Sequence, residues 1–91
     1  MKFALEVGET EKNIVEFGFN QLLGRTVIRV NRREVKKGVR LFSEPMYEEH
    51  AVDVGRQEKW QVRIKKERHQ LVGAHYAVFV NNRLVNVYKG V

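Results

Sequence analysis

The chain has 91 residues, of which 43% are hydrophobic, and it contains no cysteine. This length and apolar content suit one domain, residues 1–91, with a single core, and they argue against two independent domains. The lack of cysteine excludes a disulfide scaffold and thiolate metal sites, while the formal net charge of +6 makes an acidic partner a candidate.

The first residues do not resemble a targeting or membrane segment. The apolar stretch in 1–7 is short and is interrupted by Glu6, whereas a signal peptide or a membrane span needs a longer apolar run. We therefore expect a soluble, cytoplasmic protein that has no membrane partner.

Seven glycines and the single Pro45 divide the chain into segments of strand length. Alternating or β-branched runs predict strands, in chain order, at 3–7, 13–19, 25–30, 34–37, 47–54, 60–65, 76–80 and 84–88, with 40–42 as further strand before 47–54. A turn at 43–45 contains Ser43 and Pro45, and 71–72 is either a short strand or part of a loop.

One hairpin pattern is written twice. Val-Asn-x-Arg-x-Val occurs at 30–35 and again at 80–85, and in each copy Asn leads a tight turn between two short β-prone runs. Both faces of the second hairpin are rich in apolar residues, which predicts that this hairpin lies in the middle of its sheet.

The clearest strand pattern is at 60–65, where Trp60, Val62 and Ile64 alternate with polar residues. A helix over 56–68 is the alternative, but it would scatter these three side chains instead of forming one stripe. We expect an all-β fold, an antiparallel β-sandwich of about seven or eight short strands, ahead of a closed barrel. The expected core contains Leu5, Ile14, Ile28, Val30, Val52, Val54, Trp60, Val62, Ile64, Val78 and Val80.

The order of these features resembles one β-sandwich unit of the Fas apoptotic inhibitory molecule family. The resemblance rests on 16–35, Leu41-Phe42, the Val54-Gly55 turn, the 60–64 strand and the 78–84 hairpin, and it covers about residues 13–88. It implies an antiparallel sandwich that has no enzymatic activity and acts through protein contacts. The chain departs from the family at both hairpin turns, where Arg32 and Asn82 replace the usual glycine, so no role in cell death is transferred.

Three histidines, His50, His69 and His75, invite a metal hypothesis, but their spacing matches no known set of ligands. We therefore expect no metal site. Glycine-rich phosphate loops are also missing, so we expect no small-molecule cofactor.

No catalytic set is expected either. Glu49 and Asp53 would share a strand face but lie about 13 Å apart, too far to act as an acid/base pair. Glu48 would point to the opposite face, and Ser43 has no neighbouring base. The sequence thus predicts that the protein is not an enzyme.

Basic residues are concentrated in two stretches, 25–40 and 56–68. If these strands are adjacent, they form a positive patch that could bind an acidic partner. The candidate binding residues are Arg25, Arg29, Arg32, Arg33, Arg63 and Lys65. The alternative is an ordinary solvated surface, partly neutralised by the acidic segments 6–16 and 44–53.

Two functions from different classes remain open. The first is a non-enzymatic module that binds a protein partner or self-associates. The second is a small nucleic-acid-binding β domain, in which Tyr76, Phe79 and Tyr88 would stack on bases if they are exposed.

Overall fold

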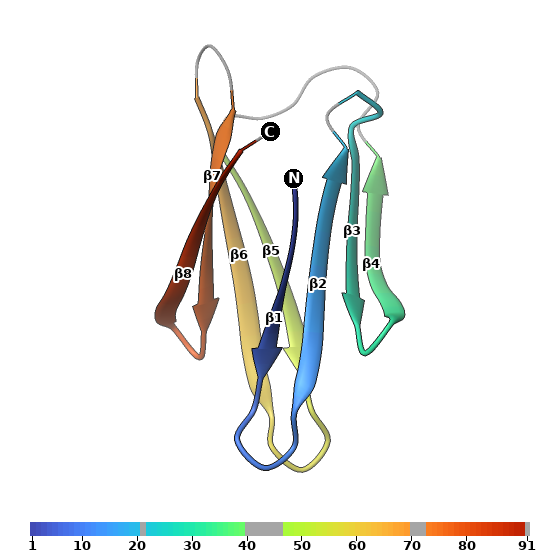
Figure 1. Ribbon diagram of the computed structural model, residues 1–91, viewed down its shortest axis with the longest axis vertical. Helices are drawn as coiled ribbons and strands as arrows, with labels where there is room; N and C mark the ends of the chain where they lie inside the picture. The colour runs from blue at the N-terminus through green and yellow to red at the C-terminus, as the bar shows by residue number, and fades with distance from the viewer. Residues whose placement is uncertain (21, 40–46, 70–72, 91) are drawn as a thin grey trace.

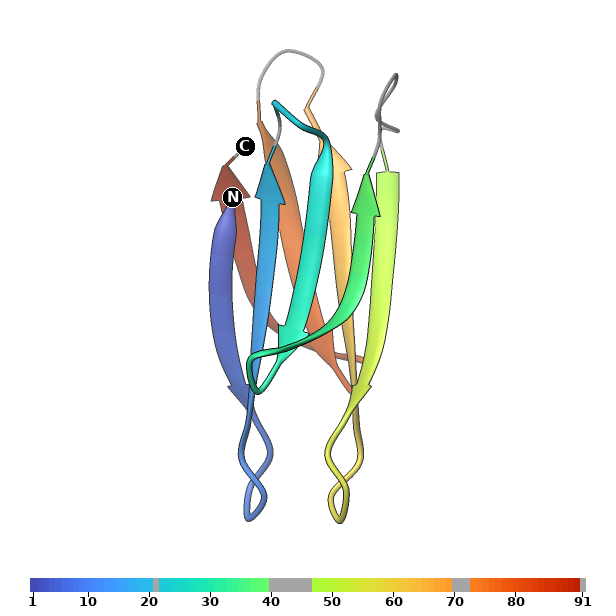
Figure 2. The ribbon, with the colours of Figure 1, turned by 90° about the vertical axis from the view of Figure 1, so that its right-hand side faces the viewer.

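Two four-stranded antiparallel sheets pack face to face in the computed structural model (Figures 1 and 2), which describes residues 1–20, 22–39, 47–69 and 73–90. The predicted all-β antiparallel sandwich is therefore confirmed. The strands are β1 Lys2–Val7, β2 Asn13–Asn20, β3 Arg25–Val30, β4 Arg33–Val39, β5 Tyr47–Val54, β6 Trp60–Arg68, β7 Ala74–Val80 and β8 Arg83–Gly90.

Each sheet is a simple meander. The first has the order β1-β2-β3-β4 and the second has the order β5-β6-β7-β8. The predicted strand at 40–42, the turn at 43–45 and the segment 71–72 lie outside the described residues. The alternation at 60–65 belongs to β6, so the helical alternative over 56–68 is wrong.

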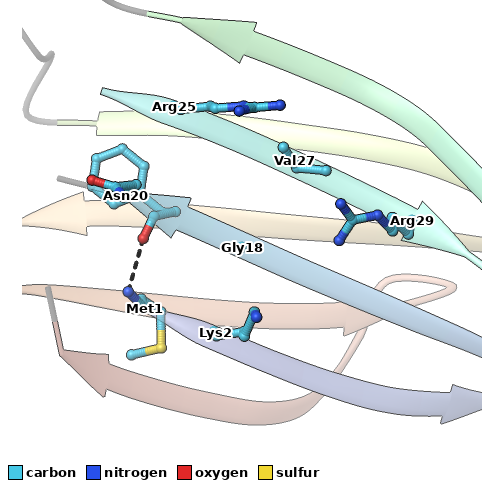
Figure 3. A pocket seen from close by; sticks show the side chains of 8 residues that line it. Met1, Lys2, Gly18, Asn20, Arg25, Val27 and Arg29 are labelled. Carbon is cyan, nitrogen blue, oxygen red and sulfur yellow. Dashed lines mark hydrogen bonds between the residues drawn. The ribbon is translucent and has the colours of Figure 1, made fainter. Parts of the chain in front are cut away.

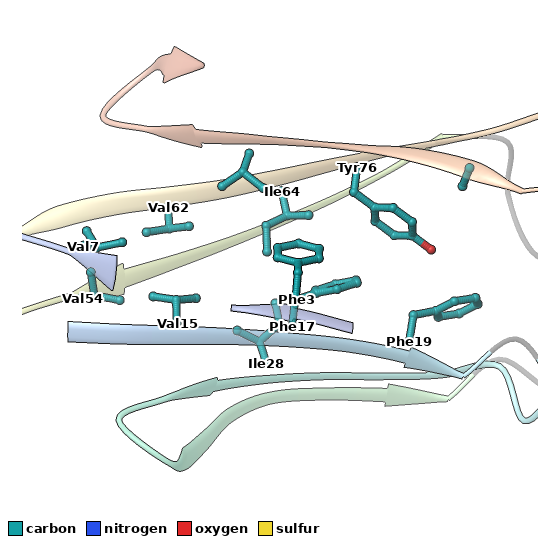
Figure 4. Close-up of a cluster of buried hydrophobic side chains, with 12 residues drawn as sticks. Phe3, Val7, Val15, Phe17, Phe19, Ile28, Val54, Val62, Ile64 and Tyr76 are labelled. Atoms are coloured by element: carbon teal, nitrogen blue, oxygen red, sulfur yellow. The ribbon is translucent and has the colours of Figure 1, made fainter. Parts of the chain in front are cut away.

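The core lies between the two sheets (Figure 4) and is built around aromatic rings. Phe17 contacts Tyr76 with ring centroids 5.4 Å apart, which links β2 of one sheet to β7 of the other. Phe3 stacks on Tyr88 at 4.0 Å and so joins β1 to β8. The buried apolar residues are Phe3, Val7, Val15, Phe17, Phe19, Ile28, Val54, Val62, Ile64, Ala74, Tyr76 and Val78.

Most of the predicted core residues are buried or packed against the core, but the prediction that Ile14 belongs to the core is wrong. Its side chain is 41% exposed, because Val15, Phe17 and Phe19 occupy the inner face of β2 and leave Ile14 on the outer face. Strand alternation is a strict period of two, so choosing the wrong phase exchanges every inner residue for an outer one.

The second hairpin is not central, contrary to the sequence prediction. Its first strand, β7, is internal, but β8 forms the edge of the sheet. The apolar residues that suggested burial, Leu84, Val85 and Val87, are 42–52% exposed. In β8, Tyr88 packs against the core, but Leu84, Val85 and Val87 remain exposed.

The two repeated hairpins have matching geometry. Each turn places two residues at positive φ, Asn31 and Arg32 in one and Asn81 and Asn82 in the other, as a tight hairpin turn requires. Each ladder then shifts register once, between Ile28 and Arg29 and at the same place in the second copy. The hairpins thus share their turn and their irregularity.

The likeness extends to the whole of each sheet. When Lys2 of β1 is aligned with Glu49 of β5, the residues of the β1–β2 pair match those of the β5–β6 pair in the same register. In each sheet the turn asparagine also binds the strand that lies before the hairpin. The Asn31 side chain accepts a hydrogen bond from the Ile14 amide in β2, and the Asn81 side chain accepts one from the Gln61 amide in β6. The two sheets are therefore two versions of one four-stranded unit.

Glutamates hold the two units together where the β1–β2 and β5–β6 loops lie side by side (Figures 1 and 2). Glu58 accepts hydrogen bonds from three amides of the first loop, those of Glu9, Thr10 and Glu11, at 2.9–3.0 Å. In return, Glu11 accepts hydrogen bonds from the amides of Arg56 and Gln57 in the second loop. We call this reciprocal pair, Glu11 and Glu58, the glutamate latch.

Candidate functional site

The six candidate basic residues are divided among three places. Arg25 and Arg29 are on the outer face of β3, where they pair in register with exposed or partly exposed residues of β2. Arg32 and Arg33 lie at and directly after the β3–β4 turn. Because the sheets pack through their inner faces, Arg63 and Lys65 on the outer face of β6 point away from the first sheet. The structure does not bring all six together.

On the second sheet, the two basic residues already have contacts. Arg63 Nε lies 3.4 Å from Glu49 Oε1. The guanidinium carbon of Arg63 and the ammonium of Lys65 also lie 5.7 and 5.0 Å from the centre of the Phe79 ring. Such cation–π contacts hold both side chains near that ring.

On the first sheet, basic side chains surround a depression (Figure 3) with a volume of about 520 Å³. Lys2 of β1 lies on one side, and Arg25 and Arg29 of β3 lie on the other. Strand β2 runs between them and places Gly18 at the floor of the depression. Its lining residues are Met1, Lys2, Gly18, Phe19, Asn20, Arg25, Val27 and Arg29. We call this surface the basic depression.

Gly18 is the residue that opens the basic depression. It is not one of the glycines with positive φ, and a Cβ built there would meet no heavy atom within 4 Å. Neither backbone conformation nor packing therefore requires glycine, although glycine in a strand costs about 0.5–1 kcal/mol relative to alanine. A glycine inside a strand often marks a place where a ligand approaches the backbone closely.

The second sheet provides an internal comparison for this site. The register places Lys65 at the position equivalent to Gly18, with Glu49 equivalent to Lys2 and Phe79 equivalent to Arg29. There the long Lys65 side chain lies over Phe79. The same backbone thus carries a side chain in one copy and an open, basic surface in the other.

The three cations of the basic depression differ in their neighbours. Arg29 lies in register between Glu16 and Glu34, whereas Lys2 pairs with Gly18, and Arg25 pairs with Asn20.

The Met1 amine adds less charge than its position suggests. It donates a hydrogen bond to the Phe19 carbonyl at 2.9 Å. Burial, and secondly the neighbouring Lys66 ammonium, lower the pKa of this amine. Lys2 and Arg25 are therefore the main cations for an anionic group placed on Gly18, and Arg29 is the third.

Sequence reasoning missed Lys2 and Gly18. The available signal was Gly18 itself, which interrupts the outer face of a strand whose inner face is Phe17 and Phe19. The distance in sequence between Lys2 and Arg25 hid their proximity, which arises only because β1 and β3 flank β2.

The histidines lie in two separate places. His50 is buried in the sandwich, with Nε2 4.0 Å from Glu48 Oε2. His69 and His75 contact each other, with ring centroids 4.3 Å apart. Within the described ranges, no group of three or more histidines and carboxylates could hold a metal ion.

The aromatic residues considered for base stacking differ in accessibility. Tyr76 is fully buried, and Tyr88 stacks on Phe3. Phe79 is partly exposed, but Arg63 and Lys65 lie over its ring.

Comparison of the chain with family models, curated proteins and solved structures gave no match. Across the part of the chain that the structure describes, no helix is long and apolar enough to cross a membrane.

Proposed function

We propose that the protein is a non-enzymatic interaction module that binds an acidic segment of a protein partner through the basic depression. The observation that carries this proposal is Gly18, a strand glycine that the fold does not need, placed among Lys2, Arg25 and Arg29. Carboxylates that approach this open stretch of sheet would meet all three cations.

A protein partner is favoured over a nucleic acid by the chemistry of the lining. The basic depression is lined by cations, Val27 and an asparagine, and its one aromatic residue, Phe19, is buried. Proteins that hold single-stranded nucleic acid usually combine a basic groove with exposed aromatic rings. Nucleic-acid binding therefore remains the second candidate.

This function agrees with what the resemblance to the Fas apoptotic inhibitory molecule family implies, namely a sandwich that acts through protein contacts. Membership in that family is part of the proposal, as is a cytoplasmic location. Neither is needed for the test below.

The test measures fluorescence anisotropy of a labelled oligoglutamate peptide with the full chain at low and high salt. We expect binding that weakens as salt rises, because the contacts are between exposed charges. Arg25→Ala or Lys2→Ala should each weaken binding about two- to five-fold, as expected for exposed ion pairs. Arg56→Ala, which removes an exposed arginine from the β5–β6 loop, is the matched control.

Gly18→Val separates binding from folding. Valine suits an extended strand, and a Cβ at this position meets no heavy atom within 4 Å. We expect the melting temperature to stay the same or rise, while the affinity for oligoglutamate falls about tenfold or more. Unchanged affinity in this variant would contradict the proposal, and tighter, salt-dependent binding of an oligonucleotide than of oligoglutamate would favour the second candidate.

A further inference from the structure

The outer face of the second sheet carries an apolar surface at its β8 edge. Ala77 pairs in register with Val87, and Phe79 pairs with Leu84, so all four side chains lie on one face. Leu84 is 52% exposed, and Val87 is 42% exposed. We call Ala77, Phe79, Leu84 and Val87 the apolar strip.

The first sheet shows that the fold does not require this apolar strip. In the equivalent register, Arg29 pairs with Glu34 where Phe79 pairs with Leu84. The register likewise places Lys37 where the second sheet has Val87. Charged residues are thus compatible with this backbone, and exposed apolar patches often mark interaction sites.

Cations border the apolar strip on two sides. Arg63 and Lys65 of β6 lie against the Phe79 ring. On β8, the exposed Lys89 follows Val87 by two residues and so shares its face. An occupant that matches both properties carries apolar side chains next to carboxylates.

We propose that the apolar strip is a second docking surface, separate from the basic depression, and that it binds a short amphipathic acidic segment of a protein partner. The apolar side chains of that segment cover Leu84 and Val87, and its carboxylates face Lys65 and Lys89. The cations on two sides of the strip favour this occupant, because its carboxylates can face Lys65 and Lys89 while its apolar side chains cover Leu84 and Val87.

The test uses the full chain and a labelled peptide in which leucine and glutamate alternate. There are two control peptides. In the first, serine replaces every leucine, and in the second, lysine replaces every glutamate. We expect the leucine–glutamate peptide to bind at least about tenfold more tightly than either control, because it alone supplies both contacts.

The decisive variant is Leu84→Glu with Val87→Lys, which transfers the residue types of the first sheet to the second. It should bind the leucine–glutamate peptide at least about tenfold more weakly while its melting temperature is unchanged. Ile14→Lys, which removes an exposed apolar residue from the other sheet, should bind as the unmodified chain does. If the double variant fails to fold, Leu84→Ser with Val87→Thr gives the same comparison.

Several outcomes would overturn this proposal. Equal binding of the serine–glutamate peptide would show that charge alone acts, and unchanged binding by the double variant would place the contact elsewhere. Dimerisation or binding to anionic lipid vesicles that the double variant abolishes would assign the apolar strip to a different occupant. Gly18→Val should leave this binding intact, which distinguishes failure here from failure at the basic depression.

Discussion

At the scale of single residues, the glutamate latch is the contact whose effect on stability is easiest to isolate. Hydrogen bonds from the Arg56 and Gln57 amides lower the pKa of Glu11. The Glu11 amide, and then contacts with Thr10 and Glu9, lower the pKa of Glu58. Both carboxylates are thus bound in their ionised form and link loops that are far apart in the sequence.

The lowered pKa values predict the pH dependence of stability. A carboxyl group with a lower pKa in the folded state binds protons more readily in the unfolded chain, so acid favours unfolding. The stabilisation by the glutamate latch is present above the ordinary glutamate pKa of 4.5 and is lost as pH falls through the lowered values. Thermal melts should therefore show a falling melting temperature below about pH 4.5.

The variant Glu11→Gln with Glu58→Gln tests this assignment. We expect a lower melting temperature than the unmodified chain at about pH 7, and a difference that shrinks towards about pH 3. Glu9→Gln alters a neighbouring exposed carboxylate whose side chain is not part of the glutamate latch, so it should show little change. A difference that is constant with pH would contradict the role of ionisation.

At the scale of elements, the two hairpin turns show what a tight turn requires. Arg32 has a φ of 68° and Asn82 has a φ of 65°. Both residues carry a Cβ, but the short polar side chain of asparagine can hydrogen-bond locally and offset the strain, whereas the arginine side chain cannot. The first turn is therefore the more strained of the two.

Glycine at these positions should relieve the strain. Arg32→Gly is expected to raise the free energy of unfolding by about 0.5–1 kcal/mol, with a smaller gain for Asn82→Gly. Urea denaturation of the unmodified chain, Arg32→Gly and Asn82→Gly measures both changes in the free energy of unfolding. A loss of stability in Arg32→Gly would mean instead that the arginine side chain makes a stabilising contact.

At the scale of the whole molecule, each sheet supplies half of one core. Neither four-stranded unit can bury its own inner face, since Phe17 packs on Tyr76 and Phe3 on Tyr88 across the sandwich. A sheet with one apolar face must bury that face against another layer to be stable.

Two separately produced chains, residues 1–46 and 47–91, test this dependence. Each alone should lack a cooperative melting transition, and mixing them should restore the β-sheet circular dichroism spectrum and a complex on size exclusion. The substitutions Glu11→Gln in the first chain and Glu58→Gln in the second should together weaken that complex more than Glu9→Gln alone. Cooperative folding of either piece as a monomer would contradict the shared core.

The repeat was only partly predictable. The duplicated hairpin turn at 30–35 and 80–85 pointed to it, and Val-Gly-x-x-Glu-Lys at 7–12 and 54–59 is a second signal that contains both glutamates of the latch. No local pattern, however, indicates that Glu11 binds the second of these loops and Glu58 the first. That exchange depends on how the two units face each other.

The strands and turns could be predicted from the amino-acid sequence, because alternation and turn chemistry are properties of neighbouring residues. The buried face of β2, the edge position of β8 and the placement of Lys2 near Arg25 became visible only in the folded molecule, as did the opposite direction of Arg63. These features depend on contacts between residues that are far apart in the sequence. The alternation of residues along the chain predicts a strand, but it does not predict which strands lie beside it.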